Sequence, residues 1–148
     1  MKIKKLDELQ YIKRGNIFKH CLFAIIGLLL LYIALIEFDI VFISQRNALL
    51  LIIIFIVSLF CIEMICYGIY PLSERRQKFI YILSGLLGLA IVIISICEMI
   101  FGKESFIENE ILSDTGAGVI MGCLLFSIFL AYVIKSICNN KTERSFEK

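Results

Sequence analysis

An acidic side chain lies inside an apolar segment of this 148-residue chain. Glu63 falls in the stretch 48–70, about four residues past its midpoint, which places it about 6 Å from the centre of a bilayer. A charged carboxylate at that depth costs about 2.5–3.5 kcal/mol, so it requires a hydrogen-bond donor or a proton. We expect no second titratable group at this depth, and Tyr67, one helical turn away, is the nearest donor. The pattern therefore indicates either a proton or cation site or a hydrogen bond between helices.

Two further carboxylates lie toward the C-terminal ends of the first and third apolar segments, which are the predicted outer ends. Glu37 stands at the end of the segment 18–38, and Glu98 lies about eight residues beyond the middle of 79–101. Together with Asp39 they have the charge to form a negative outer vestibule for cations. The simpler interpretation is that they are solvated residues at the membrane boundary, and both interpretations stay open.

The cysteines and the single histidine do not form a recognisable reactive motif. Every cysteine falls in an apolar segment or at its end, and the chain has no Cys-x-x-Cys pair, so we expect packing residues and not a disulfide framework. His20, Cys21 and Cys138 lack metal-ligand spacing, and we expect His20 to be an ordinary interfacial residue. No Ser/His/Asp set, paired carboxylates or phosphate-binding loop is present, so we predict no metal, no cofactor and no enzymatic activity.

Four apolar segments must position these side chains. The chain is 60% apolar, and the segments contain only five of its 15 basic and 13 acidic residues. As helices of 21 to 23 residues they would reach about 32–35 Å, enough to cross a bilayer core of about 30 Å. We therefore predict an all-α integral membrane protein, a single domain over 1–148 with four transmembrane helices. The predicted spans are 18–38, 48–70, 79–101 and 116–138.

The basic residues predict how the chain is oriented. If the N-terminus is cytoplasmic, thirteen of the fifteen basic residues lie on the cytoplasmic side, in the short tails 1–17 and 139–148, in the second connection and at nearby span ends. This bias follows the positive-inside rule. We predict an up-down antiparallel bundle in a bacterial cytoplasmic membrane with both termini cytoplasmic.

The same basic surface has two candidate partners. It would attract anionic lipid headgroups or an acidic soluble protein. A net charge of +2 gives no reason to expect nucleic-acid binding. The residues concerned are Lys4, Lys5, Arg14, Arg75, Arg76 and Lys78.

Small residues indicate which helix faces pack closely. In lipid, an apolar face gains little by burial against another helix, so glycines that let backbones approach are the informative signal. Stripes that contain small and polar residues follow alternating steps of four and three residues in the first and third spans, each with one glycine, and a Gly-x-x-x-Gly pair stands in the fourth. We therefore expect close helix contacts and a homo-oligomer. The glycines are Gly27, Gly88, Gly118 and Gly122.

The third connection contains capping signals. Ser105 to Glu108 has the spacing of a capping box, which favours a short acidic surface helix, and a solvated loop is the alternative. Ser113, Asp114 and Thr115 offer side-chain oxygens to the N-terminus of the fourth span.

The function expected from these features is non-enzymatic. Isoleucine occurs 29 times and alanine 6 times, which indicates an AT-rich bacterial coding sequence. We expect a small oligomeric membrane subunit that acts through partner proteins, such as a membrane sensor or an immunity or membrane-perturbing component of a bacterial defence system. The alternative is a small proton-coupled transporter or cation channel that uses Glu63.

Overall fold

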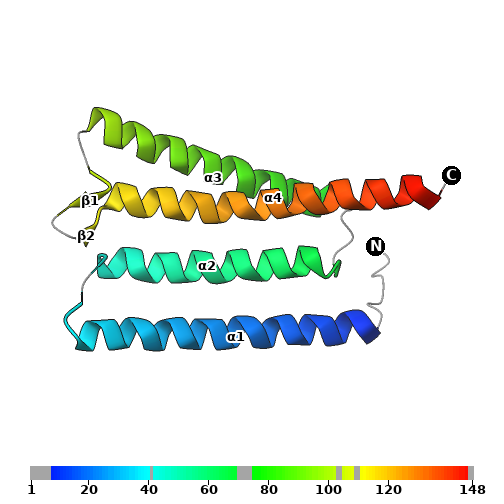
Figure 1. Ribbon diagram of the computed structural model, residues 1–148, viewed down its shortest axis with the longest axis horizontal. Coiled ribbons are helices and arrows are strands. Elements are labelled where there is room, and N and C mark those ends of the chain that lie inside the picture. Colours follow the sequence, from blue (N-terminus) through cyan, green and yellow to red (C-terminus); the bar gives the residue numbers. More distant parts are fainter. Residues whose placement is uncertain (1–7, 41, 70–74, 103–104, 109–110, 147–148) are drawn as a thin grey trace.

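A computed structural model describes residues 8–40, 42–69, 75–102, 105–108 and 111–146. This part of the chain contains four helices, each long and apolar enough to cross a membrane, and one small hairpin (Figure 1). The elements are α1 (Glu8–Glu37), α2 (Gln45–Cys66), α3 (Arg75–Phe101), β1 (Ile107–Glu108), β2 (Ile111–Leu112) and α4 (Asp114–Phe146).

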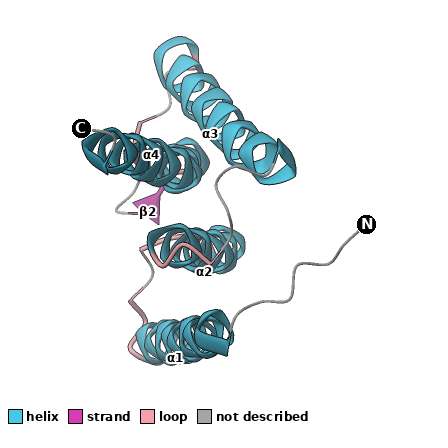
Figure 2. Cartoon of the chain, turned by 90° about the vertical axis from the view of Figure 1, so that its right-hand side faces the viewer, coloured by secondary structure: helices cyan, strands magenta, loops and turns pink. Residues whose placement is uncertain are grey.

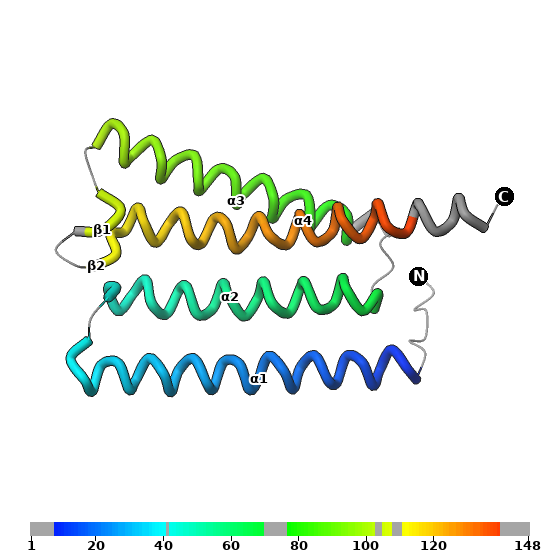
Figure 3. Tube along the Cα trace, viewed as in Figure 1, coloured from blue at the N-terminus to red at the C-terminus, as the bar shows by residue number. Residues whose placement is uncertain are grey.

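The four helices form an open row. Consecutive helices run in opposite directions (Figure 3), and the view along the helices shows the spatial order α1, α2, α4, α3 (Figure 2). The most extensive contact is between α3 and α4, followed by those of α4 with α2 and of α2 with α1. We call the end with β1 and β2 the hairpin end, and the end where α1 begins and α4 ends the terminal end. Because the row is open, α1 is an edge helix.

Glycines account for the close approach of α3 to α4. A Cβ atom added at Gly88 would lie 2.7 Å from the Gly122 carbonyl oxygen, and one added at Gly122 would lie 2.6 Å from a methyl group of Val92. A Cβ atom at Gly118 would collide with the Ser95 hydroxyl. The glycines predicted for the third and fourth spans therefore meet at one interface.

The end of α2 differs from the predicted span. The helix stops at Cys66, four residues earlier than expected, because Gly68 adopts a left-handed conformation with φ +64°. The Gly68 N–H donates to the Ile65 carbonyl, and the Ile69 N–H donates to the Met64 carbonyl, which is the Schellman pattern. This capping motif places Glu63 in the last turn of α2.

The third connection folds as a hairpin and not as the predicted short helix or loop. The Ser105 hydroxyl donates to the Ile107 carbonyl at 2.6 Å instead of capping a helix. Ile107 pairs with Leu112 across the antiparallel strands, and the Leu112 N–H donates to the Phe42 carbonyl at 2.7 Å. The β-branched Ile107 and Ile111 favour extended backbone. The hairpin thus ties the third connection to the first.

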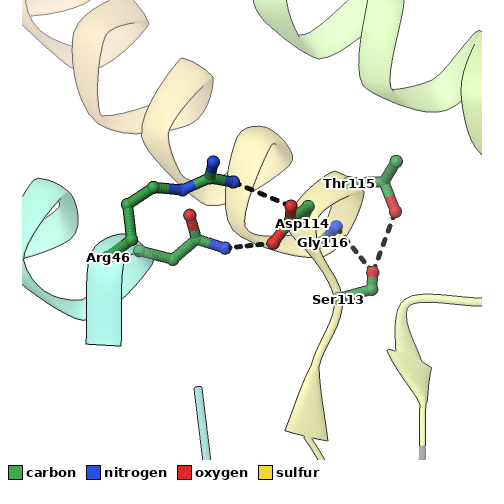
Figure 4. A network of polar contacts seen from close by, with 6 residues as sticks. Arg46, Ser113, Asp114, Thr115 and Gly116 are labelled. Atoms are coloured by element: carbon green, nitrogen blue, oxygen red, sulfur yellow. Dashed lines mark hydrogen bonds and ion pairs between the residues drawn. The ribbon is translucent and has the colours of Figure 1, made fainter. Parts of the chain in front are cut away.

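A polar network fixes α2 to α4 at the hairpin end (Figure 4). Arg46 and Asn47, in the first turn of α2, donate to the two carboxylate oxygens of Asp114 at 2.8 and 2.7 Å. Asn47 is buried, whereas the Arg46 and Asp114 side chains are mostly exposed. The Gly116 N–H donates to the Ser113 hydroxyl at 3.0 Å, so Ser113 caps α4, which confirms the predicted capping region.

We predict that Gly88→Ala destabilises the fold. The added methyl group would meet backbone atoms of α4, which cannot rotate away, so we expect a loss of about 1–3 kcal/mol in the free energy of unfolding. Unfolding by a denaturing detergent, followed by circular dichroism, measures this. Gly15→Ala is the matched control, because nothing lies within 4 Å of its Cβ position, and it should be neutral or stabilising. Equal stabilities of the two variants would contradict the close contact.

We also predict unequal roles for the two donors to Asp114. Asp114→Ala leaves the buried Asn47 amide without its partner and should cost about 1–3 kcal/mol in unfolding free energy. Arg46→Ala removes an exposed ion pair and should cost less than about 1 kcal/mol. The same unfolding assay compares them. Because Asp114→Ala removes both contacts, an equal loss in Arg46→Ala would show that the charge pair, and not the buried amide, holds this end together.

Candidate functional site

The carboxylate of Glu63 meets a histidine at the contact between α1 and α2. The Nδ1 atom of His20 lies 3.5 Å from Oε1 of Glu63. The prediction that Glu63 has no titratable neighbour at its depth is therefore wrong. Tyr67, the predicted donor, follows α2 as its capping residue, and its backbone N–H donates to the Glu63 carbonyl at 2.9 Å. Within the described residues, no hydrogen bond joins its half-exposed side chain to the Glu63 carboxylate.

Helix register explains why His20 and Glu63 meet. His20 lies 17 residues before the end of α1 at Glu37, and Glu63 lies 18 residues after the start of α2 at Gln45. Both are therefore about 26–27 Å from the hairpin end of their helix. The predicted first span begins at residue 18, close to His20, whereas α1 begins ten residues earlier, at Glu8. The pair follows from counting both helices from their shared connection.

The two oxygens of Glu63 have different surroundings. Oε1 faces His20, whose side chain is 58% exposed, whereas Oε2 is buried and has no hydrogen-bond partner among the described residues. The apolar residues Ile17, Cys21 and Met64 form a buried cluster at the same contact. An unpaired buried carboxylate oxygen is costly. The site thus combines such a carboxylate on α2 with an imidazole ring on α1.

A lysine from α4 caps the same end of α2. The ammonium nitrogen of Lys135 donates to the Cys66 carbonyl at 3.1 Å, where the last carbonyl groups of the helix have no helical partner. This contact was not expected from the sequence. Its signal was that Lys135 is the only charged residue of the predicted span 116–138 and stands three residues before the end of that span. Lys135 therefore links α4 to the helix turn that contains Glu63.

The two carboxylates of the predicted vestibule are not brought together. Glu37 is the last residue of α1, and Glu98 lies near the hairpin end of α3. Both are exposed. Because α1 and α3 are the two edges of the row, α2 and α4 separate these carboxylates.

The predicted basic surface lies at the terminal end as far as it is described. The Arg14 guanidinium carbon is 5.7 Å from the centre of the Phe18 ring, and Lys78 is exposed on α3. Arg75 and Arg76 belong to the first turn of α3. Lys4 and Lys5 lie outside the described residues.

Gly27 differs from the other predicted packing glycines. It is exposed on α1, and nothing lies within 4 Å of its Cβ position. The α3–α4 contact contains Gly88, Gly118 and Gly122, and a Cβ atom at each of them would meet atoms of the opposite helix. Within a single copy of the chain, the described residues therefore leave space beside Gly27 on α1.

A metal centre is not assembled in the described part of the chain, where no group of three or more His, Cys, Asp or Glu side chains has the required arrangement. Comparison with protein-family models, curated proteins and solved structures finds no match for this chain. Its function is therefore inferred from its own geometry.

Proposed function

We propose that this chain is a small oligomeric subunit of a bacterial cytoplasmic membrane that acts through partner proteins. A membrane sensor, an immunity protein and a membrane-perturbing component of a defence system are examples of this class. The proposed orientation has both termini in the cytoplasm, supported by the concentration of basic residues at the terminal end. The basic residues there are available to anionic lipid or to an acidic soluble partner.

The open row of helices is the observation that carries the proposal. In the most apolar 18-residue stretch of α1, only 6% of the stretch is buried within the chain. The corresponding stretches of the other three helices are 17–22% buried. Among the described residues, α1 has extensive contact with α2 alone. Four spans arranged in this way enclose no shared interior, and they leave apolar faces free for other helices or lipid.

Gly27 supports a second copy of the chain as one neighbour of α1. Small residues allow two transmembrane backbones to approach closely, and this is how many such helices associate. Gly88 and Gly122 already allow close approach of α3 and α4 within the chain. By contrast, nothing lies within 4 Å of the Cβ position of Gly27. We therefore place the proposed self-association at the Gly27 face of α1.

We predict that Gly27→Ile weakens self-association without unfolding the chain. The added side chain has space within one copy, but it would hold a second backbone away. The measurement is the oligomer mass in lipid nanodiscs or mild detergent, by native mass spectrometry. Gly15→Ile, on the same helix and equally unobstructed, is the control and should keep the wild-type mass. A wild-type chain that stays monomeric at high density in the bilayer would contradict the proposal.

A second candidate function, proton-coupled transport, is favoured by the His20–Glu63 pair. Its geometry provides two titratable groups 3.5 Å apart and a buried carboxylate oxygen without a partner. Intramembrane ionisable residues commonly mark proton or ion pathways. In this proposal Glu63 carries the proton and His20 relays it toward water at the terminal end.

If Glu63 carries protons, Glu63→Gln should abolish proton-coupled flux and leave assembly intact. We expect His20→Gln to reduce the flux at least tenfold, because the relay is lost while the carboxylate remains. The measurement is pH change inside proteoliposomes that contain a pH-sensitive dye. Glu37→Gln, an exposed carboxylate at the other end of α1, is the control and should retain flux. Wild-type flux in Glu63→Gln would exclude the transport function.

A further inference from the structure

A wholly apolar groove lies between α1 and α2. Its volume is about 350 Å³, and the side chains on both walls are hydrophobic. Several of them are about half exposed in the single chain, although the helices could have packed them together. The walls are formed by Phe18, Leu22 and Ile25 of α1 and by Ile56, Val57 and Phe60 of α2.

A positive charge stands at one end of this groove. The Phe18 and Phe60 rings pack across the α1–α2 contact with their centres 5.2 Å apart. The guanidinium group of Arg14 lies over the Phe18 ring, one helical turn toward the terminal end. Neither a salt bridge nor a hydrogen bond is found for Arg14 within the described residues. The groove thus ends at a cation for which the described residues provide no anionic partner.

This combination of a charge and an apolar channel matches one class of ligand. We propose that the groove binds an anionic glycerophospholipid, with one acyl chain along the groove and the phosphate on Arg14. An arginine binds phosphate oxygens through two parallel N–H donors, and the apolar walls match the hydrocarbon of an acyl chain. The inference rests on the proposed membrane location, but it does not depend on a protein partner or on transport.

The position of the groove on α1 favours lipid over a second copy of the chain. Nine residues separate Phe18 from Gly27, which at about 100° per residue places them on opposite sides of the helix. Nothing lies within 4 Å of the Cβ position of Gly27, which leaves room for another backbone, whereas Phe18 lines the groove. The two faces of α1 therefore have separate occupants.

Native mass spectrometry of the full chain, with phosphatidylglycerol or phosphatidylcholine added to the detergent, tests this site. We expect wild-type protein to bind phosphatidylglycerol more tightly than phosphatidylcholine. Arg14→Gln should lower phosphatidylglycerol affinity about fivefold, the effect typical of one basic residue beside anionic headgroups. Lys78→Gln removes an exposed charge at the same end, but on α3 and outside the groove, and should lower the affinity by less than Arg14→Gln does. Equal affinities for the two lipids, or equal losses in the two variants, would overturn the proposal.

A second variant tests the acyl-chain channel separately from the charge. Val57→Phe enlarges a wall side chain that is about half exposed, so it should fill the groove and lower the affinity for both lipids. The same spectra report the oligomer mass. If Val57→Phe converts an oligomer to monomers and leaves lipid binding unchanged, the groove is a protein interface and the lipid site is excluded. If this variant does not fold, the comparison of Arg14→Gln with Lys78→Gln still decides.

Discussion

The close contact between α3 and α4 is the interaction on which the arrangement of the helices depends. In a bilayer, apolar side chains gain little by leaving lipid for another helix, so van der Waals packing between closely spaced backbones must hold the spans together. Gly88 and Gly122 allow this approach, and a methyl group at either position would meet atoms of the opposite helix. α4 then holds α2 through a hydrogen bond from the Ser58 hydroxyl to the Leu124 carbonyl at 3.2 Å and through the Asp114 network. In the part of the chain that the structure describes, α1 in turn has an extensive contact with α2 alone.

This succession of pairwise contacts explains both candidate functions. Because α1 is joined to the rest by one interface, its outer faces stay free for a second copy of the chain on the Gly27 side and for lipid on the Phe18 side. The same interface contains the His20–Glu63 contact, so the Glu63 carboxylate lies where the edge helix is attached. In the proposed transport function, this pair of side chains would therefore serve both as the proton site and as a joint between α1 and α2.

The sequence predicted the four long apolar helices, the capping region before α4 and the glycines Gly88, Gly118 and Gly122. Each of these depends on local composition or on spacing along one helix. It did not predict the hairpin or the end of α2, although Gly68 followed by Ile69 is a recognisable capping signal. It also missed the His20–Glu63 contact, because each residue was placed within its own span and not measured from the shared connection. The order of helices is not encoded by small-residue stripes alone, since a stripe shows that a helix packs but not against which neighbour.

The distance between the two edge helices tests the open row most directly. Spin labels at positions 30 and 93 would lie on exposed parts of α1 and α3, seven and eight residues from the hairpin end of each helix. With neighbouring axes about 8–10 Å apart, the three spacings of a straight row separate these helices by about 24–30 Å. The measurement is double electron-electron resonance in a bilayer, with labelled protein diluted by unlabelled protein. A distance of about 24–30 Å or more is expected, whereas about 10–14 Å would indicate a closed four-helix bundle and contradict the open row.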